Sequence, residues 1–202
     1  MHRTRLAAVV ALVLTGLLVS STPPAHAAKV RARDLPTKAE VVRVFPAFQR
    51  VDIGTFPWRT VNHYGGICST WDQVDASSGQ ELAGDDLARG RSFRASVFQL
   101  RTKAQAKQLF ATYRAYVRDC GEHWAGVDTT VQRARVPKLG KQRIGYRTTE
   151  TFAPEKNLPV RRHFTLVVRK GKRLLILTVH QPKRVKAAQM ARLGRLAVRK
   201  MG

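Results

Sequence analysis

Cys120 and His123 stand three residues apart, and this spacing could serve three kinds of chemistry. The cysteine could be a nucleophile with the histidine as its base, the two could be half of a metal site, or Cys120 could pair with Cys68 in a disulfide. A structural zinc site needs four ligands in closely spaced pairs, and no second pair stands beside this one. Catalysis by Cys120 would require His123 to turn back towards the sulfur, and it would leave Cys68 without a role. The compartment in which the protein works decides among the three.

The first residues predict export. Arg3 and Arg5 precede an apolar run from Leu6 to Val19, and a short polar stretch then leads to Ala27, as in a cleaved secretory signal peptide. The run is shorter than the roughly 20 residues that cross a bilayer. No cysteine for a lipid anchor stands near the expected cleavage point. We therefore expect a secreted protein without a membrane anchor.

Two cysteines in an oxidising compartment are expected to pair. A Cys68–Cys120 bond would close a loop of about 50 residues, which the chain-entropy model values at about 4 kcal/mol. We predict this disulfide, with no metal site and no cysteine nucleophile. The length then suits one folded domain. We expect a signal peptide over residues 1–27, a flexible basic lead over 28–34 and one domain over 35–202.

Enzyme motifs are scarce in this chain. The Gly-x-Ser-x-Gly elbow, the phosphate loop, the dinucleotide fingerprint and the His-Glu-x-x-His zinc motif are all absent. Asp85 and Asp86 are adjacent but stand in an expected loop. We predict no enzyme activity and no cofactor. The alternative is a secreted hydrolase or transferase of wall polymer, in which folding brings together two distant carboxylates such as Glu150 and Asp72.

Hydrophobic periodicity predicts an α+β fold, an antiparallel sheet with two or three helices. Thr37 and Glu40 form a capping-box pattern, which predicts a short helix that begins at Lys38. Pro46 is expected to end this helix. Residues 53–64 suggest an irregular or edge strand, and residues 68–90 show no clear period. Strands are expected at residues 92–101, 129–136, 143–152 and in a hairpin at 161–182, with helices at residues 103–120 and 192–201.

The helix before Cys120 carries an apolar stripe with three- and four-residue spacing. Its members are Ala106, Leu109, Phe110, Tyr113, Tyr116 and Val117. Such a stripe is typical of a helix packed on a core, although aromatic side chains can also form a platform for a ligand.

The expected hairpin turns at Lys170 and Gly171, because glycine accepts the positive φ of a tight turn. One face then holds only apolar residues, from Phe164 to Val179. The other face mixes cationic, hydroxyl and apolar side chains, which suits a binding surface. The expected ligand-binding residues on this face are Arg161, His163, Thr165, Thr178 and His180.

Positive charge dominates the chain, with 37 lysines and arginines against 13 acidic residues, and a formal net charge of +24. The excess lies mainly after residue 128. Such a field attracts anionic polymers and anionic membrane surfaces. The second alternative function is therefore a basic protein that binds polyanions or nucleic acid, although no nucleic-acid-binding module is recognisable. The expected contact residues are Arg169, Lys170, Lys172 and Arg173 at the hairpin tip and Arg192, Arg195 and Arg199 on the last helix, whose Met190, Leu193 and Ala197 face the sheet.

The order of these elements resembles the PknH-like extracellular sensor domain of actinobacterial proteins. The resemblance rests on the capped opening helix LPTKAEVVRVF, on FQLRTKAQAKQLFATYRAYVRDC, and on the closing RLGRLAVRKM after a basic hairpin, and it covers most of residues 35–202. It implies a disulfide-stapled antiparallel sheet with a cleft for an unidentified extracellular ligand and no catalytic residues. This chain departs from the family in having one possible disulfide instead of two and in being far more basic.

Overall fold

The computed structural model describes residues 29–66, 68, 71–124 and 127–201, so the expected signal peptide at residues 1–27 lies outside the described residues. The α-helices are α1 (Lys38–Val44), α2 (Lys103–Asp119) and α3 (Ala187–Lys200), and the 3-10 helices are η1 (Ala32–Asp34), η2 (Pro46–Phe48), η3 (Leu87–Arg89) and η4 (Pro154–Lys156). The strands are β1 (Gly54–Pro57), β2 (Thr60–Tyr64), β3 (Trp71–Asp75), β4 (Ser78–Asp86), β5 (Arg91–Gln99), β6 (Gly121–Trp124), β7 (Val127–Ala134), β8 (Gln142–Phe152), β9 (Arg161–Lys170) and β10 (Arg173–His180).

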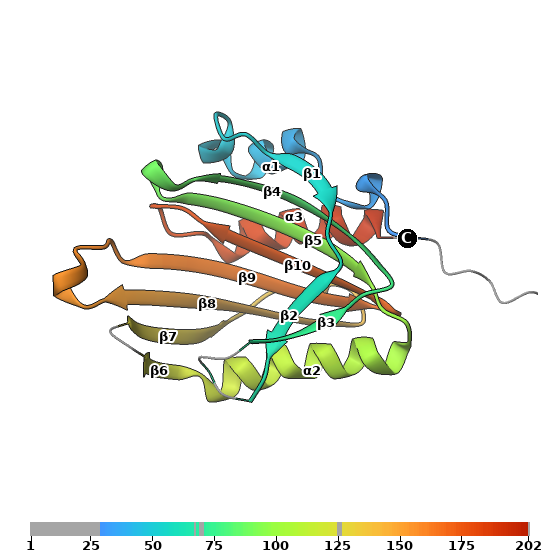
Figure 1. Cartoon of the computed structure of the whole chain (residues 1–202). Coiled ribbons are helices and arrows are strands. Elements are labelled where there is room, and N and C mark those ends of the chain that lie inside the picture. Colours follow the sequence, from blue (N-terminus) through green and yellow to red (C-terminus); the bar gives the residue numbers. More distant parts are fainter. Residues whose placement is uncertain (1–28, 67, 69–70, 125–126, 202) are drawn as a thin grey trace, which may run out of the picture.

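Eight of these strands form one antiparallel sheet in the order β1-β4-β5-β10-β9-β8-β7-β6, within the described part of the chain. The other two, β2 and β3, pair in a separate antiparallel ribbon. Figure 1 shows this β2–β3 ribbon crossing in front of the large sheet, with α2 running along the same side and α1 and α3 on the opposite side. The predicted α+β fold, an antiparallel sheet with two or three helices, is confirmed, with three α-helices in the described residues.

The side of the sheet that carries α1 and α3 holds the larger core. Apolar residues that alternate along β9 and β10, such as Leu166 and Leu177, are fully buried there against Met190 and Leu193 of α3. Gly194 of α3 allows this close approach, because a Cβ at that position would lie 2.6 Å from the Leu166 side chain. Burial of this apolar surface is the main stabilising contribution on this side of the sheet.

Two predicted helix starts are confirmed by their capping contacts. The Thr37 backbone N–H donates to Glu40 Oε2 at 2.7 Å, and the Glu40 N–H donates to Thr37 Oγ1 at 3.2 Å, which completes the capping box of α1. Thr102 accepts from the Gln105 N–H at 3.0 Å and begins α2. The last helix, α3, begins at Ala187, five residues before the closing segment at residues 192–201, and it includes Met190 as expected.

The second core lies between the sheet and α2. The stripe of α2 is buried here, with Leu109 and Phe110 against Val167 of β9 and Leu174 of β10. The ring of Tyr116 lies 5.7 Å from that of Tyr146 of β8. This layer covers only the part of the sheet face near the β9–β10 turn, where the residues are apolar.

The β9–β10 hairpin has the predicted division of faces. Leu175 pairs with Val168 and Val179 with Phe164 on the core side, while Thr178 pairs with Thr165 and His180 with His163 on the other side. The turn itself lies one residue later than expected, at Gly171 and Lys172, with a φ of 61° at Gly171.

Residues 53–64 contain β1, which is the expected edge strand of the large sheet, and also β2 of the ribbon. Two other segments differ from the expectation. Residues 68–90, where no period was apparent, contain β3 and β4. The segment expected as a flexible lead packs on the domain: Val30 is buried, its N–H donates to Ser78 Oγ at 3.0 Å, and Asp34 in η1 pairs with Arg173.

Among the helices of the described residues, none combines the length and apolar character that a membrane span requires.

Candidate functional site

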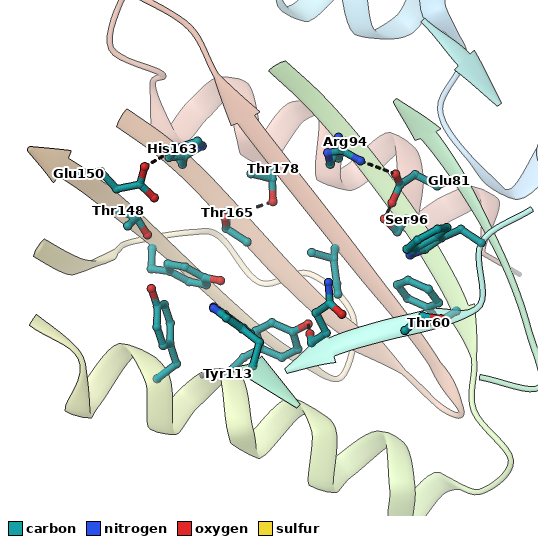
Figure 2. A pocket seen from close by; sticks show the side chains of 17 residues that line it. Thr60, Glu81, Arg94, Ser96, Tyr113, Thr148, Glu150, His163, Thr165 and Thr178 are labelled. Carbon is teal, nitrogen blue, oxygen red and sulfur yellow. Dashed lines mark hydrogen bonds and ion pairs between the residues drawn. The ribbon is translucent and has the colours of Figure 1, made fainter. Parts of the chain in front are cut away.

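A cleft of about 390 Å³ lies on the face of the sheet that α2 covers only in part. Its walls come from the sheet, from α2 and from the β2–β3 ribbon, so residues far apart in the sequence meet there. Figure 2 shows the side chains that line it. The volume is at the lower end of the range of about 300–1,000 Å³ that is typical of small-molecule sites.

Hydroxyl and charged groups of β8, β9 and β10 form one wall of the cleft. Thr165 and Thr178 are opposite each other in the ladder, with their Oγ1 atoms 3.2 Å apart. His163 Nε2 lies 3.7 Å from Glu150 Oε2, and this pairing holds the pKa of Glu150 below its ordinary value. Glu150 therefore presents an ionised carboxylate to the cleft at neutral pH.

A second polar group closes the other end of the cleft, on β4 and β5. The buried carboxylate of Glu81 accepts from Ser96 Oγ at 2.6 Å and from Arg94 Nη1 at 3.0 Å. Arg94 also donates to Asp85 at 3.2 Å. Because both carboxylates bind this guanidinium, its positive charge is balanced within the protein.

Aromatic side chains line the rest of the cleft. Tyr113 and Tyr116 come from α2, Tyr146 from β8, and Trp71 from the β2–β3 ribbon, with the Trp71 and Tyr116 rings 5.0 Å apart. Burial raises the pKa of all three tyrosines, so their hydroxyl groups stay protonated and neutral. Trp58 also lines the cleft, and the side chains of Trp58 and Trp71 are 43% and 44% exposed.

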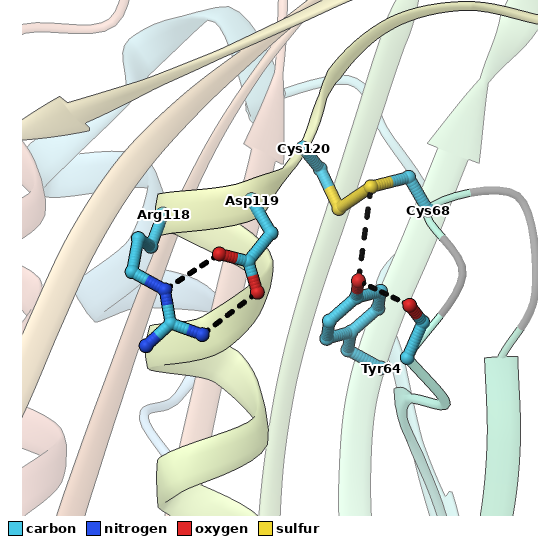
Figure 3. A network of polar contacts seen from close by, with 6 residues as sticks. Tyr64, Cys68, Arg118, Asp119 and Cys120 are labelled. Atoms are coloured by element: carbon cyan, nitrogen blue, oxygen red, sulfur yellow. Dashed lines mark hydrogen bonds and ion pairs between the residues drawn. A yellow bond between two sulfur atoms is a disulfide. The ribbon is translucent and has the colours of Figure 1, made fainter.

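The disulfide fastens the β2–β3 ribbon to the end of α2. Cys68 and Cys120 are bonded, with their Cα atoms 5.4 Å apart, as predicted (Figure 3). The Tyr64 hydroxyl donates to the Gly66 carbonyl at 2.6 Å and lies 3.9 Å from Cys68 Sγ. The Tyr113 hydroxyl donates to the Asn62 carbonyl of the ribbon. Since Cys120 is bonded to Cys68, it serves neither as a nucleophile nor as a metal ligand.

No protein-family model and no curated protein matches the sequence. Among solved structures, the extracellular domain of PknH from Mycobacterium tuberculosis aligns with a TM-score of 0.52 and 12% sequence identity, over 83% of this chain and 93% of that one. The chain has a PknH-like fold. An uncharacterised protein from Mycobacterium smegmatis aligns with a TM-score of 0.43 and 12% identity, over 84% of this chain and 99% of its own.

Within the PknH-like fold, three of the five residues expected to bind a ligand line the cleft: His163, Thr165 and Thr178. The other two lie beyond its end. The His180 ring packs on His163 with centroids 4.8 Å apart, and the Arg161 guanidinium lies over the Phe152 ring. Ligand binding by any of the five remains a prediction.

The residues expected to contact polyanions separate into two groups. Arg192, Arg195 and Arg199 are exposed on α3, and Lys170 and Lys172 are partly exposed at the hairpin tip. Arg169 and Arg173 are engaged inside the domain and do not belong to the exposed basic surface. Arg169 donates to Gln142 and to the Gly171 carbonyl, and Arg173 donates to Gln99, Asp34 and the Met201 carbonyl.

The carboxylate pair considered for catalysis, Glu150 with Asp72, is not brought together in the cleft. Glu150 lines the cleft, whereas Asp72 is exposed on β3 outside it. The other carboxylate of the cleft, Glu81, is separated from Glu150 by the four strand spacings from β4 to β8, roughly 19 Å. Paired glycosidase carboxylates stand about 5–10 Å apart.

Sequence reasoning missed the parts of the site that come from outside the hairpin, namely Trp58, Trp71, Glu81 and Arg94. One signal was present for the tryptophans, since large aromatic residues in polar stretches can form an exposed apolar patch, and such patches mark binding sites. Glu81 and Arg94 could have been placed together only if the pairing of β4 with β5 had been predicted. The glycines of β4 interrupt its strand pattern, so β4 was not recognised.

Proposed function

We propose that this chain is an exported, non-catalytic recognition domain of the sensor type, which binds a small, uncharged, hydroxyl-rich ligand of the carbohydrate class in the cleft. The observation that carries the proposal is the composition of the cleft. It combines half-exposed tryptophans with buried tyrosine rings and with hydroxyl and carboxylate groups, while its arginine is already paired.

This composition matches the two kinds of surface on a sugar. Aromatic rings offer large, rigid apolar faces on which the C–H groups of a sugar ring can stack. The threonines and the ionised Glu150 offer acceptors and donors for hydroxyl groups. An anionic ligand is disfavoured inside the cleft, because Glu81 and Glu150 would face it and Arg94 is occupied by its own carboxylates.

Export is supported by three observations of different kinds. A disulfide persists in oxidising compartments, the solved domain with a similar fold is extracellular, and the first 27 residues have the pattern of a signal peptide. A binding function without catalysis is supported by the wide separation of the two cleft carboxylates.

The test is a titration of the protein with neutral di- to tetrasaccharides released from cell-envelope polymers, followed by tryptophan fluorescence and calorimetry. We expect saturable binding that Trp71→Ala weakens at least about tenfold, equivalent to about 1.4 kcal/mol. Phe56→Ala is the matched control, because Phe56 is an exposed aromatic residue that does not line the cleft. Equal affinities in Trp71→Ala and the wild type would overturn the proposal, as would binding of anionic sugars alone.

A second contact is supported by the exposed side chains of Arg192, Arg195 and Arg199 on α3. Through this face we propose a weak, salt-dependent association with anionic surfaces of the cell envelope.

A further inference from the structure

A second cavity, of about 320 Å³, lies at the far ends of β7, β8 and β9 and under the loop that leads into α3. Arg147 and Thr149 of β8 and Arg162 of β9 line it, and these residues alternate along their strands with the cleft residues Thr148 and His163. Their side chains therefore leave the sheet on the side of α1 and α3. We call this space the arginine cavity. Thr148 and His163 also contribute to its wall, so it borders the cleft across the sheet.

The pairing register of β7, β8 and β9 places the polar side chains of the arginine cavity next to one another. Gln132 of β7 pairs with Arg147 of β8, and Arg162 of β9 pairs with Thr149 of β8. Arg184 comes from the loop after β10, and its neighbour Val185 is buried in the core, which anchors the loop at this place. Three guanidinium groups thus surround one space, with an amide and a hydroxyl beside them.

The charge of the arginine cavity is not balanced by the protein. Among the described residues that line it, none is an aspartate or a glutamate. This contrasts with the cleft, where Arg94 binds two carboxylates. Burial and the positive charge of Arg184 both lower the pKa of Arg147, so the structure holds this cation in surroundings that disfavour its charge.

Arg147 also has an unmet hydrogen bond. Its guanidinium lies 4.8 Å from the centre of the Phe164 ring, which fixes the plane of the group. Its Nε is buried and finds no acceptor among the described residues. A buried donor without an acceptor is unfavourable, and an oxyanion in the cavity would supply the missing acceptor.

We propose that the arginine cavity binds a phosphate ester, with Arg147, Arg162 and Arg184 as its ligands. Planar guanidinium groups recognise the oxygens of phosphate in a bidentate manner, which lysine cannot do. The cavity volume reaches the lower end of the range for small-molecule sites, about 300–1,000 Å³, so it has room for the organic part of an ester as well as for the phosphate. The site is separate from the proposed sugar cleft and does not depend on it.

The experiment is a titration of the isotope-labelled protein with glycerol 3-phosphate, observed through the Nε–H resonances of its arginines. We expect the Arg147 resonance to shift and saturate. Arg147→Lys keeps the charge but loses the bidentate geometry, and we expect it to weaken the affinity at least about tenfold. Arg184→Gln, in the exposed loop, gives a second variant that leaves the strands untouched, and it should weaken binding to a similar extent.

A charge-matched control separates a built site from the general field. Arg147→Gln with Arg162→Gln and Arg184→Gln removes three charges at the cavity, and Arg192→Gln with Arg195→Gln and Arg199→Gln removes three charges on α3. Loss of binding in the first triple variant and not in the second supports the proposal. Equal loss in both, unchanged affinity in both Arg147→Lys and Arg184→Gln, or a shift that never saturates would overturn it.

Two further arms identify the source of the ester. Inorganic phosphate at the same concentration shows whether the organic part contributes. Vesicles of phosphatidylglycerol, added to the Arg192→Gln, Arg195→Gln and Arg199→Gln triple variant and followed through the Arg147 resonance, show whether a lipid headgroup reaches the cavity. Tighter binding of glycerol 3-phosphate than of inorganic phosphate supports an ester ligand. Binding of inorganic phosphate alone would overturn the ester assignment.

Discussion

His163 occupies a central position among the polar residues of the sheet. It lies 3.7 Å from Glu150 in the cleft, packs on the His180 ring and contributes to the wall of both cavities. His180 Nδ1 donates to the Arg162 carbonyl at 2.9 Å, which leaves Nε2 without the proton when this ring is neutral. His163 and His180 therefore link Glu150 in the cleft to Arg162 at the arginine cavity, on the other side of the sheet.

Acidification should destabilise the fold through His180. Burial lowers the pKa of His180, and the charges of His163 and Arg161 lower it further, against the hydrogen bond to Arg162. The unfolded chain therefore takes up this proton first as the pH falls below the ordinary value of 6.5, and stability declines. Above that pH His180 is neutral in both the folded and the unfolded chain, so it does not lower the stability of the fold.

The measurement compares the free energy of unfolding of the wild type and of His180→Asn at about pH 7.5 and about pH 5.5. We expect a smaller decline in the variant, which keeps a donor for the Arg162 carbonyl. Glu150 does not confuse the result: its folded pKa is lowered below 4.5, so the stability it contributes is lost only at lower pH. Identical declines in the two proteins would show that His180 does not titrate differently in the two states.

At the scale of elements, the β2–β3 ribbon is the least supported part of the cleft. Among the described strands it pairs only with itself, and it is held to the rest by the disulfide, by the Tyr113 hydroxyl, by aromatic contacts and by the burial of Val61 in the core beside α2. The segment between β1 and β2 passes so close to β4 that a Cβ on Gly79 would lie 2.1 Å from the Trp58 carbonyl oxygen. Trp58 follows the β1–β4 pairing, and its N–H donates to the Gly79 carbonyl, whereas Trp71 lies in the ribbon and its position over the cleft depends on how the ribbon is held.

Removing the disulfide should loosen this ribbon before the rest of the molecule. We expect Cys68→Ser with Cys120→Ser to lower the free energy of unfolding by about 4 kcal/mol. Hydrogen exchange should rise in β2 and β3 while the β9–β10 hairpin stays protected, because the hairpin is central in the large sheet. The reduced wild type is the control for the serine substitutions. Unchanged exchange in the ribbon would mean that its packing and the Tyr113 hydrogen bond fix it without the disulfide.

The elements that sequence could predict are those whose patterns are local. The caps at Thr37 and Thr102 and the alternation in β9 and β10 depend on neighbouring residues, and the structure confirms them. Strand β4 was missed for a physical reason. Gly79 and Gly84 replace apolar residues where the Trp58 and Asp52 backbones cross the sheet, and no side chain fits there. The period of two is therefore interrupted, and Glu81 could not be placed in the cleft.

At the scale of the whole molecule, acidic and basic groups are distributed unevenly. The cleft contains Glu81 and Glu150, whereas exposed arginines lie on α3 and unbalanced ones surround the arginine cavity. The total charge of +24 does not describe the cleft, whose lining includes two carboxylates and one arginine. Net charge is a sum over the sequence, and only the fold assigns each charge to a face.

Association with anionic surfaces should depend on α3. We expect the wild type to bind phosphatidylglycerol vesicles at low salt and to be released as ionic strength rises to physiological values, where the Debye length is about 8 Å. Arg192→Gln with Arg195→Gln and Arg199→Gln should reduce the bound fraction severalfold, since each basic residue near such a surface contributes about 1 kcal/mol. Co-sedimentation measures it. Salt-insensitive binding would contradict an electrostatic contact.

The contacts of Arg173 also guide the handling of the protein. This one side chain binds Asp34, near the beginning of the described chain, and the Met201 carbonyl, near its end. Thr178 in the cleft stands five residues further along β10, roughly 17 Å away. A tag fused at either end of the described chain, before Lys29 or after Met201, would therefore hold the molecule by the same corner. Immobilised in this way on a sensor chip, the protein would keep the cleft away from the point of attachment.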